Sequence, residues 1–154
     1  MNYKVRKGSA TMIKEINFDM DGTIANLYGV ENWLAYLIKE DTTPYAVAKP
    51  LVRFSVLARK LHQLQKQGYK LRVISWLSKT GSVEYNNQVS AVKKDWLQKR
   101  LPSVKWDEIV IVPYGTPKST CGQGFLFDDE ENNRKEWNGT AFGVENILEV
   151  LKTF

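Results

Sequence analysis

The chain alternates short apolar runs, which are typical of buried strands, with longer segments in which apolar residues recur at helical spacing. Strands are predicted at residues 13–18, 69–75, 109–112, 124–127 and 141–142. Helices are predicted at residues 30–39, 52–67, 88–101 and 144–152. The segments 41–50 and 78–87 are rich in polar residues or proline and are predicted to be loops.

Strands that alternate with helices predict an α/β fold, because each helix returns the chain to the start of another parallel strand. The expected architecture is a Rossmann-like three-layer sandwich with a parallel central sheet. At 154 residues the chain suits one hydrophobic core, and residues 13–154 are expected to form a single domain. Residues 1–12 are predicted to be a disordered leader.

Two aspartates follow the first predicted strand. Asp19 and Asp21 are separated by one residue, so in an extended chain both carboxyl groups face the same way. Two carboxylates this close repel each other unless a cation lies between them or one is protonated. The pair therefore predicts a hard divalent metal, Mg²⁺, with one carboxylate ionised and the other able to transfer a proton. Gly22 and Thr23 come next, and their amides are expected to point at an anion.

Other readings of the acidic pair are less favoured. An Asp-x-Asp-Gly string also occurs in calcium-binding loops, but no glutamate follows at the required spacing. The remaining alternative is that the pair forms a solvated acidic turn after a strand. The residues at the other strand ends decide between this alternative and a metal site.

Polar side chains also follow the later strands. Ser75 and Trp76 end the second predicted strand, Lys118 lies in the loop after the third, and Asp128 and Asp129 follow the fourth. In a parallel sheet the carboxyl ends of all strands open on one edge, where ligands bind. We therefore expect these residues to converge on Asp19 and Asp21.

Each of these residues also has a simpler, purely structural interpretation. Ser75 has the character of a turn residue, and Ser78 and Thr80 compete with it as sources of a hydroxyl. Lys118 fits a solvated loop, and residues 128–131 fit the acidic first turn of a helix. Trp76 is more typical of a core than of a substrate contact. Their joint order along the chain is what favours a site.

The string Phe18-Asp19-Met20-Asp21-Gly22-Thr23, followed in order by Ser75, Lys118 and the acidic pair, resembles the four motifs of the haloacid dehalogenase-like (HAD) phosphohydrolase superfamily. The resemblance implies that Asp19 is the nucleophile and forms an aspartyl-phosphate. It implies that Asp21 protonates the leaving oxygen and then deprotonates the attacking water.

The resemblance also implies a metal site and a phosphate site. Mg²⁺ would be held by the Asp19 carboxylate, the Asp21 backbone carbonyl and Asp129, with Asp128 as an outer partner. The substrate phosphate would contact Gly22, Thr23, Ser75, Trp76 and Lys118.

The substrate is less constrained than the chemistry. Segments inserted after the first motif act as caps in this family, and residues 26–50 are the candidate for a small cap or flap. A small cap leaves an open site, and we expect a small phosphate ester such as a nucleoside monophosphate. The alternatives are a phosphatase of nucleic-acid 3′ or 5′ ends and a non-catalytic phospho-signalling or binding domain on the same fold.

Composition narrows the setting. The net charge of +5 favours anionic ligands without requiring nucleic acid. The only histidine, His62, lies in a predicted helix, which argues against a histidine-based triad or a zinc site. The single cysteine, Cys121, excludes an internal disulfide and fits a reducing cytoplasm. No apolar run suits a membrane helix, so no membrane partner is expected, and the oligomeric state is left open.

Overall fold

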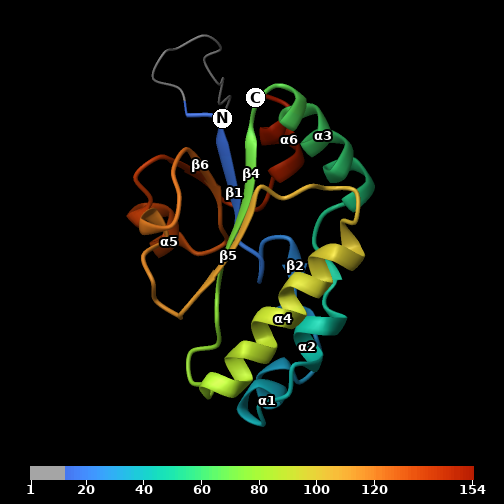
Figure 1. Cartoon of the computed structure of the whole chain (residues 1–154), viewed down its shortest axis with the longest axis vertical. Coiled ribbons are helices and arrows are strands. Elements are labelled where there is room, and N and C mark those ends of the chain that lie inside the picture. The colour runs from blue at the N-terminus through green and yellow to red at the C-terminus, as the bar shows by residue number, and fades with distance from the viewer. Residues whose placement is uncertain (1–12) are drawn as a thin grey trace.

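The computed structural model describes residues 13–154, so the predicted leader at residues 1–12 lies outside the described part of the chain. Its centre is a five-stranded parallel sheet in the order β5-β4-β1-β6-β7 (Figure 1). The strands are β1 (Glu15–Phe18), β4 (Lys70–Trp76), β5 (Glu108–Val112), β6 (Phe125–Phe127) and β7 (Thr140–Phe142). The helices around it are α3 (Phe54–Lys66), α4 (Val83–Arg100), α5 (Glu131–Glu136) and α6 (Ile147–Leu151). The predicted α/β class and parallel sheet are confirmed.

The strand order changes direction at β1. From β1 the chain proceeds outward through β4 to β5, then crosses back to β6 and continues to β7. Phe18, the last residue of β1, is therefore paired with Val73 on one side and with Phe127 on the other. Such a switch point leaves a crevice beyond the carboxyl ends of the two central strands.

One face of the sheet carries the main core. Ile16 and Phe18 of β1 are completely buried there, and the Phe18 ring stacks on Phe127 with centroids 5.2 Å apart. In Figure 1, α3 and α6 lie on this side of the sheet. Helices α3, α4 and α6 contribute to this core the buried side chains Leu57, Leu61, Leu64, Trp96, Leu97, Ile147 and Leu151. Helical spacing predicted this apolar face of α3, and the prediction is confirmed.

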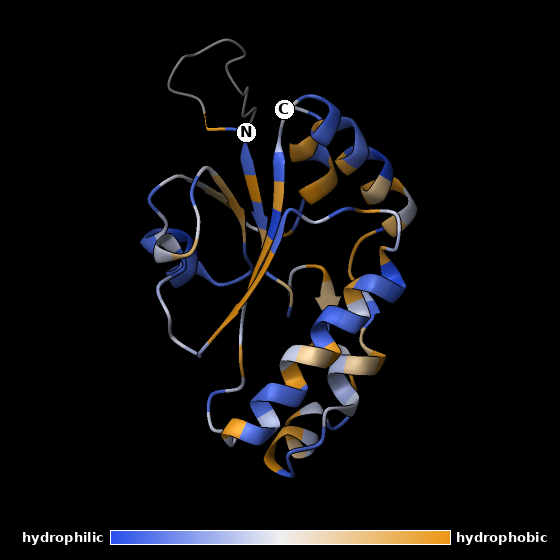
Figure 2. Ribbon diagram, in the orientation of Figure 1, coloured by the Kyte–Doolittle hydropathy of each residue, from blue (hydrophilic) through white to orange (hydrophobic). Residues whose placement is uncertain are grey.

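The opposite face is covered by α5 and is partly polar. Figure 2 shows the contrast, since α6 is hydrophobic and α5 is hydrophilic. Asn17 of β1 is completely buried on this face, and its side chain accepts a hydrogen bond of 2.9 Å from Arg72. Arg72 also forms ion pairs with Glu15 and Glu108. The buried polar side chains of this face named here are thus paired, as the energetics of burial require.

Helix α4 begins earlier than predicted. Residues 83–87 were expected to be part of a loop because they are mostly polar, but they form the first turns of α4. Ser82 caps this end, since its hydroxyl accepts a hydrogen bond of 3.1 Å from the Tyr85 amide, and Glu84 lies in the first turn. Serine before an acidic first turn favours a helix start, and this signal outweighs the polar composition.

Residues 26–50, the predicted cap, contain more structure than expected. They hold α1 (Trp33–Ile38), α2 (Thr43–Val47) and the 3-10 helix η1 (Leu27–Gly29), between the short antiparallel strands β2 (Ala25–Asn26) and β3 (Lys49–Pro50). The prediction of a loop at residues 41–50 is therefore wrong. Pro44 lies in the first turn of α2. Proline is favoured there because a backbone N–H at this position would have no partner within the helix.

The segment packs on α4 beyond the edge of the sheet (Figure 1). Leu27 and Tyr45 form a separate buried cluster with Tyr85 and Val89 of α4. The first half of α4 thus supports the predicted cap, whereas its second half belongs to the main core. Within residues 13–154, no helix combines the length and apolar character needed to cross a membrane.

We expect Ser82→Ala to lower the free energy of unfolding by about 1 kcal/mol, because α4 loses its N-cap. The hydroxyl also donates to Glu40 at 2.7 Å, so the change loosens the attachment of residues 26–50. Urea denaturation would measure the effect. Ser90→Ala, in the middle of the same helix, is the matched control and should be neutral or slightly stabilising. Equal stability of the two variants would contradict the capping role.

Candidate active site

Three carboxylates meet at the switch point. Asp19 follows β1, Asp128 and Asp129 follow β6, and one oxygen from each lies within 4.8 Å of the others. The Asp19 amide donates to the Phe127 carbonyl at 3.0 Å, which extends the pairing of β1 and β6 into the site. The convergence expected from the strand ends is present for these three residues.

A buried lysine lies inside this cluster. The Lys118 ammonium is 2.8 Å from Asp19 Oδ1 and 2.7 Å from Asp128 Oδ2, and its residue is only 1% exposed. Burial alone would lower the pKa of Lys118, but the two carboxylates outweigh that effect and raise the pKa above its ordinary value. Lys118 is therefore a permanent cation that offsets part of the negative charge. A 3-10 helix, η2 (Lys118–Thr120), positions it in the short connection to β6.

The loop after Asp19 holds the cluster from the other side. The Thr23 hydroxyl donates to Asp19 Oδ2 at 2.9 Å and lies 3.4 Å from Asp129 Oδ1. Gly22 has a φ of 81°, and a Cβ at this position would collide with the Asp129 carboxylate. Only glycine meets both requirements without strain.

The amides of this loop do not face an anion. Gly22 N–H donates to the Ala25 carbonyl and Thr23 N–H donates to the Met20 carbonyl. The prediction that these two amides would point at an anion is wrong, because the tight turn consumes both donors. Gly22 and Thr23 act on the neighbouring carboxylates instead.

The two aspartates after β6 have different surroundings. Asp128 is completely buried, and its oxygens accept hydrogen bonds from Lys118, the Glu130 amide and the Asn133 side chain. Asp129 is less buried and faces Thr23. Burial, together with the charge of Asp19, raises the pKa of both carboxyl groups. A divalent cation would relieve this repulsion, and carboxylate oxygens are the ligands that Mg²⁺ prefers. The donor set therefore fits the predicted metal, with Asp129 better placed than Asp128 as a direct ligand.

Asp21 is held by a second buried lysine. Lys93 on α4 is 1% exposed and donates to Asp21 Oδ2 at 2.8 Å, to Ser75 Oγ at 2.7 Å and to the Trp76 carbonyl at 2.7 Å. All three donors of the ammonium are used. Burial raises the pKa of the Asp21 carboxyl, and the charge of Lys93 opposes this effect without reversing it.

Ser75 and Trp76 are placed differently from each other. Ser75 is completely buried against Lys93 and does not line the cavity described below, whereas the competing hydroxyl residues Ser78 and Thr80 do. Trp76 lines the cavity, and its indole nitrogen donates to the Thr116 carbonyl at 2.9 Å. Contact of Ser75 with a phosphate stays a prediction.

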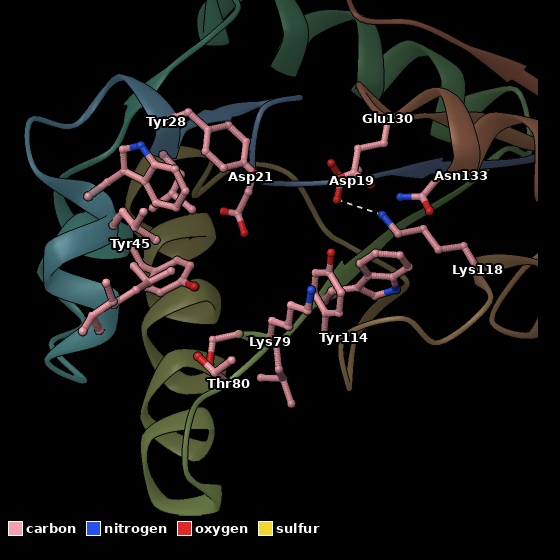
Figure 3. A pocket seen from close by; sticks show the side chains of 18 residues that line it. Asp19, Asp21, Tyr28, Tyr45, Lys79, Thr80, Tyr114, Lys118, Glu130 and Asn133 are labelled. Atoms are coloured by element: carbon pink, nitrogen blue, oxygen red, sulfur yellow. Dashed lines mark hydrogen bonds and ion pairs between the residues drawn. The ribbon is translucent and has the colours of Figure 1, made fainter.

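The site opens into a cavity of about 370 Å³ between residues 26–50 and the strand ends. Asp19, Asp21 and Lys118 form its polar end, with Glu130 and Asn133 beside them. Figure 3 shows Tyr28 and Tyr45 on one side of Asp21, and Tyr114 and Lys79 on another side of the cavity. The volume suits a small organic ligand.

Several of these residues were missed in the sequence. Lys93 occupies the apolar stripe of α4, four residues after Val89 and three before Trp96, and a lysine at such a position signals a buried partner. Tyr114 follows β5 and could have been found by the same strand-end rule that found Ser75. Tyr28, Tyr45 and Asn133 carry no comparable signal.

Comparisons with known proteins add no family to this picture. No protein-family model matches the chain. No curated protein shows significant similarity to its sequence.

Repulsion among the carboxylates makes a prediction for stability. Because the folded-state pKa of Asp129 is raised, ionising this group costs stability, and the cost grows as the pH rises above about 4, the ordinary pKa of aspartate. In metal-free buffer at pH 8, Asp129→Asn should raise the Tm by at least about 2 °C, the change that about 1 kcal/mol produces at this chain length. The gain should shrink toward pH 4. Asp95→Asn, in an exposed i,i+4 ion pair, is the control and should change little.

Lys93→Met should lower the free energy of unfolding by about 2–3 kcal/mol, because Asp21 loses its cation and two further acceptors lose their donor. Chemical denaturation measures the change. Lys94→Met alters the next residue of the same helix, which is exposed, and should stay within about 0.5 kcal/mol of the parent. A similar small effect for Lys93→Met would contradict the anchoring role.

Proposed function

We propose that this protein is a Mg²⁺-dependent phosphomonoester hydrolase that works through an aspartyl-phosphate, on the plan of the HAD-like phosphohydrolases. The observation that carries the proposal is the placement of Asp19. Its carboxylate lies at the switch point of the sheet, against Lys118 and Thr23, beside Asp129 and at the polar end of a cavity. Asp21 also pairs with a buried lysine and lines the cavity, but among the described residues it lies outside the group of three carboxylates that could share a metal ion.

The first step forms one bond and breaks another. A carboxylate oxygen of Asp19 attacks phosphorus, and the ester P–O bond to the alcohol breaks as the new O–P bond forms. The hydrogen bonds from Lys118 and Thr23 fix the orientation of the carboxylate before substrate binds. Placement of this kind supplies much of the rate in phosphoryl transfer.

Asp21 supplies and recovers the proton. The carboxyl pKa of Asp21 is raised by burial, so a proton is held more readily than on an exposed aspartate and is available for the leaving oxygen. Asp21 then takes a proton from the attacking water as the acyl-phosphate O–P bond breaks, which returns Asp19 and releases inorganic phosphate. Lys93 holds the Asp21 side chain in place for both transfers.

Mg²⁺, when bound, supplies charge neutralisation around the transferring phosphoryl group. The residues that would hold it are Asp19, Asp129 and the backbone of Asp21, with Asp128 as an outer partner. Asp128, in turn, fixes Lys118 through the ion pair of 2.7 Å. We place the reaction in the cytoplasm, because the single thiol of Cys121 fits a reducing compartment.

The central test is hydrolysis of a generic aryl phosphate with Mg²⁺ and with EDTA. Release of phosphate should require the metal, and Asp19→Asn should lower kcat by at least about 10³-fold, because the nucleophile is lost. Asp95→Asn makes the same chemical change on the surface of α4 and should retain the activity of the parent. Full activity of Asp19→Asn would rule out the mechanism.

A further inference from the structure

The walls of the cavity carry more aromatic rings than the binding and hydrolysis of a phosphate group require. Five aromatic residues line it, from three separate parts of the chain: Tyr28, Trp33, Tyr45, Trp76 and Tyr114. Two of them are not core residues, since Tyr28 is 47% exposed and Tyr114 is 48% exposed. An aromatic ring that lines a cavity and stays exposed gains no stabilisation from burial unless a ligand covers it.

The first wall comes from residues 26–50. Tyr28 lies edge-on to Trp33 with ring centroids 5.0 Å apart, and the Tyr28 ring lies against Gly22 of the acidic loop. Leu34 and Ile38 continue this wall along α1 and are themselves 54% and 73% exposed. The apolar face of α1 therefore points at the cavity, which explains why none of its side chains is buried.

The second wall comes from the strand ends. Trp76 at the end of β4 and Tyr114 after β5 pack together with centroids 4.9 Å apart and an interplanar angle of 59°. The Lys118 ammonium lies 5.5 Å from the Trp76 ring centre, so this wall adjoins the phosphate end of the site. Lys79 lies 5.6 Å from the Tyr114 ring centre at the outer end.

The cavity thus has a charged end and an aromatic end. Figure 3 shows Asp19 and Lys118 at one part of the cavity, with Tyr28 and Tyr114 flanking the space in front of them. On the proposed function, a ligand that fills it carries its phosphate at the charged end and a flat apolar group at the other end. A sugar phosphate offers these rings less apolar surface than a planar aromatic group does, so it would leave more of their area uncovered.

We infer that the substrate is a small phosphate monoester whose alcohol carries a planar aromatic ring, and a nucleoside monophosphate is a metabolite with this chemistry. This inference rests on the proposed function for the fate of the phosphate. The ring lies between the Tyr28 and Trp33 wall and the Trp76 and Tyr114 wall, where stacking is tolerant of the identity of the base. Specificity therefore comes from residues 26–50 as much as from the strand ends.

The test compares two phosphate esters of ribose, one with an aromatic base on the sugar and one without it. Uridine 5′-monophosphate and ribose 5-phosphate present the same phosphate on the same sugar carbon. The nucleotide should have a kcat/KM at least about tenfold higher, the size of effect that one stacked base produces. Equal values would overturn the inference while leaving the hydrolase intact. Faster turnover of a 5′-phosphorylated oligonucleotide than of the mononucleotide would also overturn it, in favour of a nucleic-acid end.

Variants of Tyr114 test whether this side chain produces the preference for the nucleotide over the sugar phosphate. Tyr114→Ala should reduce the ratio of the two kcat/KM values several-fold, and Tyr114→Phe should keep it, because the ring and not the hydroxyl makes the contact. Tyr114 is exposed, so neither change is expected to unfold the protein. Tyr36→Ala, on α1 but outside the cavity, is the matched control and should keep the ratio of the parent. An unchanged ratio in Tyr114→Ala would remove Tyr114 from the proposed wall.

Binding separates this inference from the reaction. In EDTA, calorimetric titration should show uridine 5′-monophosphate binding more tightly than ribose 5-phosphate, and Tyr114→Ala should weaken the nucleotide alone. Nucleotide binding without hydrolysis of any ester would refute the proposed function and support the aromatic pocket. Hydrolysis of both esters at equal rates, with equal affinities, would support the proposed function and refute the aromatic pocket.

Discussion

Electrostatic repulsion among three clustered carboxylates governs the architecture of this site. Asp19, Asp128 and Asp129 are brought together by the strands they follow, and their charge must be offset for the fold to persist. The ammonium of Lys118 provides part of that compensation at hydrogen-bonding distance from two of them. The remainder appears as raised carboxyl pKa values, which is the electrostatic condition that a divalent cation would relieve.

A second lysine connects this centre to the rest of the molecule. Lys93 lies where the two hydrophobic clusters of α4 meet, and it binds Asp21, Ser75 and the end of β4 at once. The same helix supports residues 26–50 through Tyr85 and Val89. One helix thus positions both the carboxyl group that is proposed to transfer protons and the aromatic wall that would select the substrate. Rigid support of this kind is what keeps a catalytic constellation at productive distances.

The alternation of the five core strands with helices, the parallel sheet and the edge of the sheet where the candidate site lies could be predicted from the sequence. These features depend on apolar periodicity and on the residues at strand ends, which are local properties of the chain. The errors were local as well, and they include helix α5, which was not among the predicted helices. The polar start of α4 and the proline of α2 were read as loops, because capping by Ser82 and the tolerance of Pro44 in a first turn were outweighed by composition.

By itself, then, the sequence determined which side chains stand at the strand ends, because burial alternates with fixed periods along any strand or helix. Tertiary structure alone decided what those side chains touch. Ser75 turns out to face Lys93, the amides of Gly22 and Thr23 close a turn, and Tyr28 meets the acidic loop. The first contact joins β4 to α4, and the other two depend on the path of the loop that follows β1. Their geometry follows from how helices, strands and loops pack, which apolar periodicity does not encode.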